Sequence, residues 1–457
     1  MTIVERLAAF VDRASYEDLS QRAAEELKIR IIDSLGVAIG AIGSEVMQMV
    51  RMHVEDFSRS GASTLIGGGS TSPDLAALYN SGLVRYLDYN DSYLARGETC
   101  HPSDNLGALL AAGQCAEADG KALLTALAVA YQVQCRLSDE APVRAKGFDH
   151  TTQGAYAVAA GVSKILGLEP EKIANAIAIS ATPLNALRVT RTGTLSHWKG
   201  LAYPYTAFGA TASTFLAMRG ITGPKEVFEG NKGFQETIAG PFSIDWERED
   251  LERVTGTIIK KYNAEIHSQA TLEGVLELKE KHRFDPAAIE RVDIDTFDVA
   301  YNIIGGGEEG DKTRIRTKEE ADHSLQYMVA AALLDGRVSP DQYKPERIGG
   351  TDVQELLRKV IVRPEPAYSA RFPESMPCRI RIRMADRQVF EMEKQDYEGF
   401  HSRAMEWKAV TRKFDSLAAT YAPERVRGRI VDLVRDLERH TVDELMELLT
   451  GIGVPAA

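Results

Sequence analysis

The part of the chain that most restricts its fold is the stretch from Gly107 to Gly220, where apolar runs rich in alanine and glycine follow one another. Five of these runs have the composition of helices: LLAAGQCAEA, KALLTALAVAYQVQCRL, TTQGAYAVAAGVSKILG, EKIANAIAISAT and YPYTAFGATASTFLAMRG. Small side chains let the axes of packed helices come close together. The stretch therefore predicts a compact domain of many helices, and a functional site is expected in the polar loops between them.

A second domain is indicated after Phe242, where the pattern changes. In CRIRIRM the apolar residues alternate with arginines, and IERVDIDTF alternates in a similar way, so both segments predict strands. A hairpin is expected to join CRIRIRM to RQVFEME, and EEADHSLQYMVAAALLDG predicts a helix. The segment from about 265 to 398 is therefore expected to be an α+β domain. From Glu406 onward the pattern is helical again and would rejoin the first domain.

The charge balance excludes some classes of partner. The chain has 54 Lys and Arg against 66 Asp and Glu, and its net charge of −12 argues against a nucleic acid or an anionic membrane surface. No uncharged apolar run reaches the ~18–20 residues of a membrane span, and the N-terminal residues lack the apolar core of a signal peptide. The four cysteines show no CxxC spacing, so reduced thiols and a cytoplasmic location are expected.

Candidate acid/base residues gather in RYLDYNDSYLARGETCHPSDNLG, which begins at Arg85. Asp88 and Asp91 lie within one helical turn of each other, Ser92 follows directly, and His101 comes ten residues after Asp91. A histidine that moves protons needs a neighbour that sets its tautomer and charge. A polar loop that joins these residues therefore suits acid/base catalysis.

The end of the same segment also predicts local structure. Ser103 or Asp104 is well placed to cap the helix that resumes with GALLAAG. The alternative explanation of the whole segment is a capped turn with solvated carboxylates and one structural histidine.

Further candidates lie outside this segment, namely His150, Lys199, Lys260, His267 and Tyr327. Histidines can act as acid or base, and lysines can stabilise the negative charge that develops beside a carboxylate during a reaction. The combination suits chemistry on a carboxylate substrate. For any one of these histidines, a structural role is the more common alternative.

No metal and no cofactor is expected. Asp88, Asp91 and His101 have side chains of the kinds that bind metals, but nothing in their spacing requires an ion. The chain contains no HExxH, GxSxG or CxxC motif.

Three long segments of the chain resemble one known family. They are RYLDYNDSYLARGETCHPSDNLGALLAAG, SHWKGLAYPYTAFGATASTFLAMRGITGP with FEGNKGF, and DHSLQYMVAAALLDGR. All three are similar to the MmgE/PrpD family, which includes 2-methylcitrate dehydratase, cis-aconitate decarboxylase and iminodisuccinate epimerase. The resemblance implies a mainly α fold, in which a large all-helical domain, residues 1–262 and 400–457, carries an inserted α+β lid domain, residues 263–399. It also implies a homodimer.

The resemblance further implies the residues of the site. The catalytic residues would be His101, Asp88, Asp91 and His150, and the substrate-binding residues Ser92, Lys199, Lys260, Lys261, His267 and Tyr327. Lys260 and Lys261 are adjacent, which leaves open the one that enters the site. Ser92 stands where many members carry threonine, a change that keeps the hydroxyl group, and Asn263 stands where many carry proline.

The segments AEIHSQATLEG and DHSLQYMVA are nearer to the 2-methylcitrate dehydratase branch of the family. They imply a cofactor-independent lyase that dehydrates a small di- or tricarboxylate by acid/base catalysis. The same residues would also suit a cis-aconitate-type decarboxylase or an iminodisuccinate-type epimerase. A carboxylate-binding helical protein without turnover is the alternative from another class. The lid is expected to close through hinges near 260–265 and 395–400, which would bring His267 and Tyr327 to the site.

Overall fold

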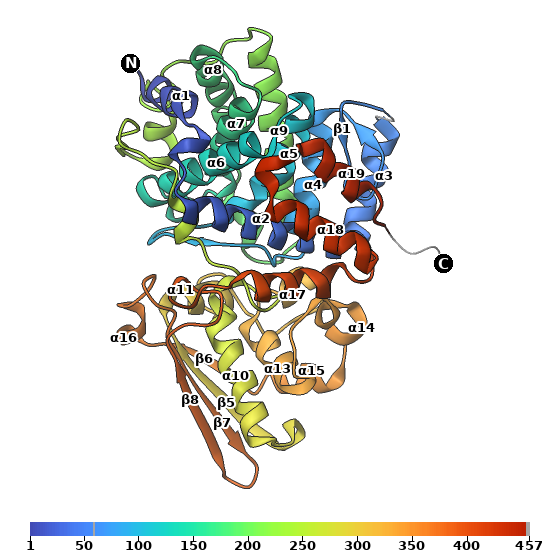
Figure 1. The fold of residues 1–457 in the computed structure, drawn as a ribbon. Helices are drawn as coiled ribbons and strands as arrows, with labels where there is room; N and C mark the ends of the chain where they lie inside the picture. The colour runs from blue at the N-terminus through green and yellow to red at the C-terminus, as the bar shows by residue number, and fades with distance from the viewer. Residues whose placement is uncertain (58–59, 454–457) are drawn as a thin grey trace. The chain divides into compact units, whose positions relative to one another are not determined.

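The computed structural model describes residues 1–57 and 60–453, and the chain divides into two units. Unit 1 comprises Met1–Thr190, Gly200–Thr257 and Glu406–Ala457. Unit 2 comprises Arg191–Lys199 and Ile258–Met405. The chain is mostly helical and contains a small mixed sheet (Figure 1), which confirms the prediction of a mainly α fold.

Helices are the main regular structure of unit 1. Its long helices are α1 (Ile3–Arg13), α2 (Gln21–Ala41), α3 (Glu45–Phe57), α4 (Pro73–Tyr86), α5 (Leu106–Cys115), α6 (Gly120–Glu140), α7 (Thr151–Ile165), α8 (Pro170–Ala181), α9 (Trp198–Met218), α17 (Trp407–Ala418), α18 (Glu424–Arg435) and α19 (Val442–Thr450). Two short hairpins accompany them: β1 (Ser63–Thr64) with β2 (Ser70–Thr71), and β3 (Tyr93–Leu94) with β4 (Thr99–Cys100). Helices α5 to α9 confirm the five predicted between Gly107 and Gly220.

Helices α2 and α17 come from opposite ends of the chain and pack closely together. A Cβ atom on Gly36 would lie only 2.9 Å from the Cα atom of Phe414, so the absence of a side chain lets the two backbones approach. Beside this contact, the buried Nζ atom of Lys413 lies 2.7 Å from Oδ1 of Asp33. The C-terminal helices therefore complete the core of unit 1.

Unit 2 is built on a four-stranded sheet in the order β6 (Val360–Pro364), β5 (Ile289–Thr296), β7 (Cys378–Met384) and β8 (Val389–Lys394). Strands β5 and β6 are parallel, and the other neighbouring pairs are antiparallel. The prediction of β5 and of the β7–β8 hairpin is confirmed, whereas β6 was not predicted. Its sequence, VIVRP, is short, and it ends in a proline that weakens the strand signal.

Apolar and polar side chains alternate along β7, so they lie on opposite faces of this sheet. Helices α10 (Gln269–His282) and α13 (Leu325–Asp335) pack against each other and against the face that carries the buried Ile380 and Ile382. On the other face, Nη2 of Arg381 lies 2.7 Å from Oδ2 of Asp295. The remaining helices of unit 2 are short: α11 (Asp298–Ala300), α12 (Lys318–Ala321), α14 (Pro345–Ile348), α15 (Thr351–Leu357) and α16 (Pro366–Ser369).

The segment EEADHSLQYMVAAALLDG does not form the single helix that was predicted. It forms α12 and α13, which are separated by Asp322, His323 and Ser324. The Oγ atom of Ser324 accepts a hydrogen bond from the backbone N–H of Tyr327 and so caps the second helix. The break leaves Asp322 and His323 on a turn.

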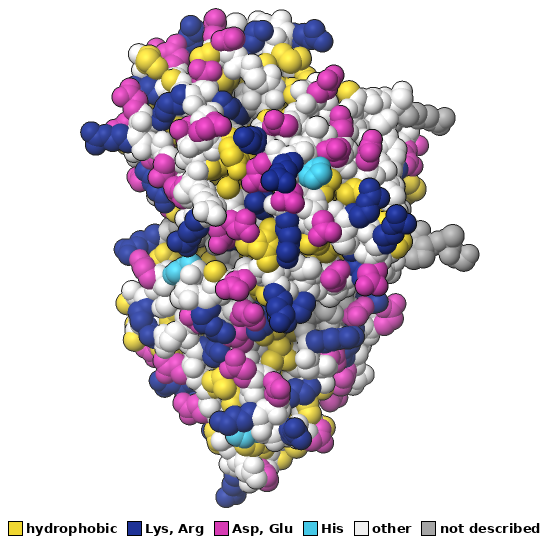
Figure 2. Space-filling view, viewed as in Figure 1, with side chains coloured by type: hydrophobic (Ala, Val, Ile, Leu, Met, Phe, Trp, Pro, Cys, Tyr) yellow, Lys and Arg dark blue, Asp and Glu magenta, His cyan; other side chains and the backbone are white. Residues whose placement is uncertain are grey.

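The surface mixes charges of both signs. On the face shown in Figure 2, lysine and arginine side chains are intermingled with aspartate and glutamate side chains. In residues 1–57 and 60–453, none of the helices is both long enough and apolar enough to cross a membrane.

Candidate active site

The β3–β4 hairpin of unit 1 places Ser92 opposite His101. The two strands are antiparallel and Tyr93 pairs with Cys100, so the next residue pair toward the open end of the hairpin is Ser92 and His101. The Oγ atom of Ser92 lies 3.0 Å from Nδ1 of His101. The structure therefore brings these two predicted site residues into hydrogen-bonding contact.

The backbone sets the tautomer of His101. Its Nδ1 atom lies 2.8 Å from the carbonyl oxygen of Asp91. A carbonyl oxygen can only accept a hydrogen bond, so Nδ1 carries the hydrogen and donates it. In the neutral ring, Nε2 then carries the lone pair and is the atom that can take a proton. Asp91 thus orients His101 through its backbone.

The side chain of Asp91 stabilises the loop itself. Its Oδ1 atom accepts hydrogen bonds from the backbone N–H of Ser103, at 3.1 Å, and from the Ser103 hydroxyl, at 2.7 Å. Its Oδ2 atom accepts one from the hydroxyl of Tyr131 at 2.7 Å. Burial, together with the adjacent negative charge of Asp91, raises the pKa of Tyr131 well above its usual value. Asp91 is a positioning residue in this geometry, and the catalytic role proposed for it from the sequence stays a prediction.

Asp88 lies just beyond the end of α4. The prediction that Asp88 and Asp91 share a helical turn is wrong, because α4 ends at Tyr86 and both residues belong to the loop that follows. The backbone of Asp88 has a φ of 54°, in the left-handed region, which aspartate tolerates better than most residues. Its Oδ1 atom accepts a hydrogen bond from Nη1 of Arg85 at 2.6 Å. The arginine therefore holds the carboxylate in place.

Asp104 completes this acidic group and was not predicted as a site residue. Burial raises its pKa to about 7, although the charge of Arg85 and a hydrogen bond from Asn90 act in the opposite direction. Nδ2 of Asn90 donates to Oδ1 of Asp104 at 2.8 Å. The prediction that Ser103 or Asp104 caps the next helix is wrong, because Asn105 occupies the N-cap position of α5.

His150 lies near His101 in the same unit. It occupies the N-cap position of α7, and the centroids of the two imidazole rings are 5.4 Å apart in an edge-to-face arrangement. Its Nδ1 atom lies 3.3 Å from Oδ1 of Asp149, whose Oδ2 lies 3.5 Å from Nη1 of Arg188. Asp149 was missed in the sequence, although its position directly before a histidine was the available signal. Two buried imidazoles, each with its own oriented partner, can move two protons on one small molecule.

A second group of predicted residues lies in unit 2, where Lys199 forms an ion pair with Asp322. Lys318 and His323 also contact this carboxylate, at 2.8 Å and 2.9 Å respectively. Burial alone would raise the pKa of Asp322, but the charges of Lys199 and Lys318 outweigh it and hold the pKa well below its usual value. Asp322 was not predicted, because the segment around it was assigned to a helix.

Lys260 and Lys261 have different surroundings. The Nζ atom of Lys261 lies 2.9 Å from Glu273 and 2.9 Å from Glu398, which ties this side chain to structural carboxylates. Lys260 is fully buried, and its charge acts on the carboxylate of Glu265. Of the two lysines, Lys260 therefore has the surroundings expected of a residue that binds an anion.

His267 and Tyr327 are also buried in unit 2. His267 forms a pair with Glu265, in which Nδ1 lies 2.7 Å from Oε1. The hydroxyl of Tyr327 donates to the backbone carbonyl of Gln342, and its ring centroid lies 6.2 Å from that of Tyr343. The contact with substrate proposed for Tyr327 stays a prediction.

The predicted residues thus fall into two groups, each within one unit. The first group is Asp88, Asp91, Ser92, His101 and His150, and the second is Lys199, Lys260, Lys261, His267 and Tyr327. The pairs Asp322–His323 and Glu265–His267 contain donor groups that metals use. However, Asp322 already pairs with two ammonium groups, and both oxygens of Glu265 bond to His267. Both geometries favour hydrogen bonding and ion pairing.

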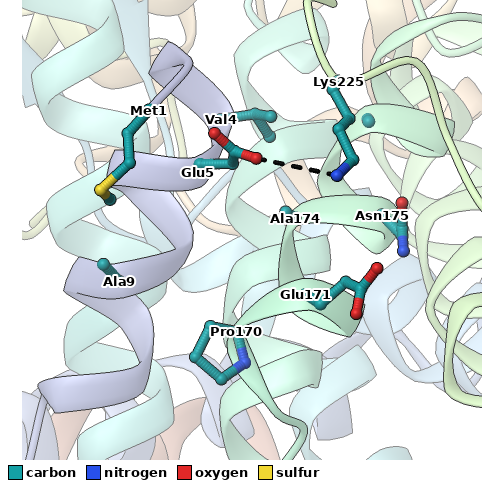
Figure 3. A pocket seen from close by; sticks show the side chains of 10 residues that line it. Met1, Val4, Glu5, Ala9, Pro170, Glu171, Ala174, Asn175 and Lys225 are labelled. Carbon is teal, nitrogen blue, oxygen red and sulfur yellow. Dashed lines mark ion pairs between the residues drawn. The ribbon is translucent and has the colours of Figure 1, made fainter.

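A pocket of about 420 Å³ opens on the surface of unit 1 between α1, α8 and Lys225 (Figure 3). Its polar groups include Glu5, which lies 3.9 Å from Lys225. None of the predicted site residues lines it. The candidate chemistry therefore belongs to the two groups above rather than to this pocket.

Comparison with protein families identifies the chain. Residues 5–247 match the MmgE/PrpD N-terminal domain, and residues 262–439 match the MmgE/PrpD C-terminal domain. The chain belongs to the MmgE/PrpD family, as the sequence predicted.

Named relatives resemble nearly the whole chain. The 2-methylcitrate dehydratase of Salmonella typhimurium is 28% identical over 471 residues, which cover 95% of this chain and 94% of that protein. The 2-methylcitrate dehydratase of Escherichia coli K12 is 29% identical, with 82% of each chain covered. The cis-aconitate decarboxylase of Mus musculus is 27% identical, with 99% of this chain and 94% of that protein covered.

Proposed function

We propose that this protein is a lyase that dehydrates a small di- or tricarboxylate of the 2-methylcitrate type by acid/base catalysis. The observation that carries the proposal is the fixed tautomer of His101, whose Nδ1 donates to the Asp91 carbonyl while His150 lies beside it. The names of the bacterial relatives support the same reaction class.

Dehydration of such a substrate removes a proton from the carbon beside a carboxylate and expels the hydroxyl group on the next carbon. In the proposed mechanism, Nε2 of neutral His101 takes the proton, because Nδ1 already carries one. Asp91 and Ser92 keep the ring in place during this step. The proton acquired gives an imidazolium, whose charge the adjacent acidic loop stabilises.

The departing hydroxyl needs a proton in order to leave as water. His150 is the proposed donor, and Asp149 at 3.3 Å favours its protonated form. Negative charge also develops on the carboxylate beside the attacked carbon, as it gains enolate character. Lys199 and Lys260 are the proposed cations that bind the substrate carboxylates and stabilise this charge.

Decarboxylation is the second candidate reaction, since the mouse relative that covers 99% of this chain is a cis-aconitate decarboxylase. Loss of CO₂ from such a substrate leaves a carbanion, and the same histidines could protonate it. Epimerisation of an iminodisuccinate-type substrate would use the same proton transfers. The three reactions differ in the bond that breaks, so their products separate them.

The test is a substrate panel of 2-methylcitrate, citrate, cis-aconitate and iminodisuccinate, followed by NMR. A dehydratase converts 2-methylcitrate to an unsaturated tricarboxylate without release of CO₂. Release of CO₂ from cis-aconitate would replace the first proposal by the second. Stabilisation of the protein by these compounds without any product would instead support a binding protein without turnover.

The proposed reaction uses only side chains, so we propose that it needs no cofactor. Enzyme dialysed against a chelator is expected to retain full turnover. Activity that disappears on dialysis and returns with an added metal would contradict this.

We also propose that the inserted segment, with expected limits 263–399, acts as a lid. Inside unit 2, the N–H of Ile259, directly before the first predicted hinge segment, donates to the carbonyl of Gly399 in the second at 3.0 Å. They are therefore expected to move together. Small-angle scattering with and without a bound tricarboxylate tests for closure, and identical curves would contradict it.

A homodimer is proposed for the active form. Helix α9 supports it, because the chain has no charged residue from Gly200 to Met218, and Tyr205 and Leu216 are about half exposed. An uncharged face of this kind can meet a second copy without repulsion. Light scattering tests the assembly, and a monomer at assay concentrations would contradict the proposal.

A further inference from the structure

Glu265 makes two hydrogen bonds to a single residue. Its Oε2 atom accepts from the backbone N–H of His267 at 2.8 Å, and its Oε1 atom lies 2.7 Å from Nδ1 of the same residue. Both residues lie at the short helical turn Ile266–Ser268, directly before α10. The carboxylate thus holds both the backbone and the ring of His267.

The protonation state of Glu265 follows from its surroundings. Burial would raise its pKa, but the charge of His267 and the hydrogen bond to it outweigh burial and lower the pKa to about 2. The charges of His323 and Lys260 act in the same direction. Glu265 is therefore ionised at neutral pH and can only accept hydrogen bonds. Nδ1 of His267 must be the donor, which leaves Nε2 as the nitrogen that faces away from Glu265.

The ring of His267 is also held by aromatic contacts. The ring centroids of Phe297 and Phe372 lie 5.7 Å and 5.6 Å from that of His267, and the two phenylalanines stack on each other at 4.6 Å. Nε2 of His267 is buried and has no hydrogen-bond partner in the part of the chain that the structure describes. Buried polar atoms are nearly always satisfied, so one that is not needs an explanation.

The dyad is connected to the cluster around Asp322. The backbone N–H of Glu265 donates to the carbonyl oxygen of Asp322 at 3.3 Å. Asp322 in turn pairs with Lys199 and Lys318. The charge of Lys260 also acts on Glu265, so a lysine lies close enough to the dyad to favour an anionic ligand.

A purely structural role would leave part of this geometry unexplained. Glutamate caps a short helical turn elsewhere in unit 2, where Glu365 accepts a hydrogen bond from the backbone N–H of Ala367 at 3.2 Å. That cap needs only one carboxylate oxygen. In Glu265 the second oxygen binds the imidazole and sets the direction of Nε2.

We infer that Glu265 is a positioning residue, which presents Nε2 of His267 as a hydrogen-bonding group for an oxygen atom of the carboxylate substrate. The inference rests on the proposed function for the nature of the substrate. Beyond the proposed function, we infer that substrate affinity depends on the carboxylate of Glu265, although this group does not itself contact the substrate. Glu265 acts through His267, in the way that outer carboxylates orient the histidines of metal sites.

The test compares Glu265→Gln with Glu365→Gln. Both glutamates accept a hydrogen bond from the backbone N–H two residues further on, but Glu365 has no histidine at that position. We expect Glu265→Gln to raise KM by roughly 10- to 100-fold, by analogy with outer carboxylates, and to change kcat less. Glu365→Gln should change neither quantity. Equal effects of the two substitutions would show that Glu265 is only a cap.

Two substitutions of His267 control for misfolding. His267→Asn keeps a donor near the position of Nδ1 and removes Nε2, whereas His267→Gln keeps an amide near Nε2. We expect the asparagine variant to lose affinity and the glutamine variant to recover part of it, at similar melting temperatures. Equal affinity in the two variants would overturn the role of Nε2.

A binding measurement separates this inference from the proposed reaction. In protein labelled with ¹⁵N-histidine, the Nε2 resonance of His267 is identified as the one that is missing from the spectrum of His267→Asn. Citrate should shift this resonance whether or not turnover occurs. If citrate shifts this resonance but no panel compound is converted, the proposed reaction fails and the inference holds. If turnover occurs but the resonance does not respond to citrate or 2-methylcitrate, the inference fails and the reaction holds.

Discussion

The imidazole rings of His101 and His150 stand edge to face, with their centroids 5.4 Å apart. One ring is oriented by a backbone carbonyl and a serine hydroxyl, and the other by a carboxylate. The Asp149 carboxylate beside His150 favours a charged imidazole there, whereas the Asp91 carbonyl fixes the hydrogen on Nδ1 of neutral His101 and leaves Nε2 able to accept a proton. This difference is the physical basis for assigning the base to His101 and the acid to His150.

The first prediction concerns His101→Asn. The asparagine amide can still donate to the Asp91 carbonyl, but it has no counterpart of Nε2. Turnover is expected to fall by roughly 10²–10⁴-fold, the usual contribution of a general acid or base. Steady-state kinetics on the substrate of the panel measure the effect. His53→Asn, on the exposed face of α3, is the matched control. A His101→Asn enzyme with unchanged turnover would remove His101 from the mechanism.

The second prediction concerns the pH dependence of stability. Burial raises the pKa of Asp104 to about 7 in the folded protein, from an ordinary value near 3.8. Between these values the folded state holds one more proton than the unfolded state, so the free energy of unfolding falls as pH rises from about 4 to about 7. Asp104→Asn should flatten this slope, by at most about 1.4 kcal/mol per pH unit.

Urea unfolding at several pH values measures this slope. Glu98→Gln should act in the same direction, since burial raises the pKa of Glu98 to about 7 as well. Asp56→Asn, at an exposed carboxylate of α3, is the surface control. Parallel stability curves for wild type and Asp104→Asn would show that Asp104 is ionised in the folded protein at neutral pH.

The third prediction distinguishes the adjacent lysines. Lys260→Met keeps the apolar stem of a buried side chain and removes the charge that is proposed to bind substrate, so KM is expected to rise at least tenfold. Lys261→Met should leave KM nearly unchanged, because Lys261 pairs with Glu273 and Glu398. Its loss should lower stability by about 1 kcal/mol or less, as is usual for a partly exposed pair. Kinetics and thermal melting of both variants provide the check, and the reverse order of KM values would assign Lys261 to the site.

The fourth prediction concerns Tyr327→Phe. The change removes the hydroxyl that donates to the carbonyl of Gln342 and leaves that buried acceptor unsatisfied. The free energy of unfolding should fall by about 1–3 kcal/mol. If turnover drops instead while stability holds, Tyr327 contacts the substrate, as the resemblance implied.

The parts of the fold that could be predicted are those in which apolar residues recur at the spacing of a helix or a strand. The alanine-rich helices and the alternating arginines of β7 show their period in the sequence. Close packing at Gly36 could be anticipated from a glycine within an apolar helix, although its partner Phe414 could not. Partners of this kind are set by tertiary structure, which leaves no local signal.

The site was predicted in its residue types more than in its geometry. Ser92 and His101 were both named, but their contact depends on the register of a hairpin with only two residues in each strand. Ser103 and Asp104 resemble helix caps in sequence, yet Asp91 and Asn90 bind their side chains instead. Asp322 was not predicted as a site residue, because the sequences on both sides of it favour a helix. The sequence therefore did not indicate the break between α12 and α13, which Ser324 stabilises as a helix cap. At Ser103 and Asp104, contacts with residues more distant in the sequence overrode a local preference.

The pairing of Lys413 with Asp33 has a consequence for the order in which the protein can fold. Helix α2 is made early in synthesis, but its neighbour α17 is made only after the whole of unit 2. At about 5–20 residues per second, the ribosome needs roughly 20 to 80 seconds to go from one partner to the other. During that interval Asp33 and the apolar face around Gly36 lack the helix that covers them. A nascent chain is therefore expected to recruit chaperones at α2 and to release them once residues 407–418 have left the ribosome.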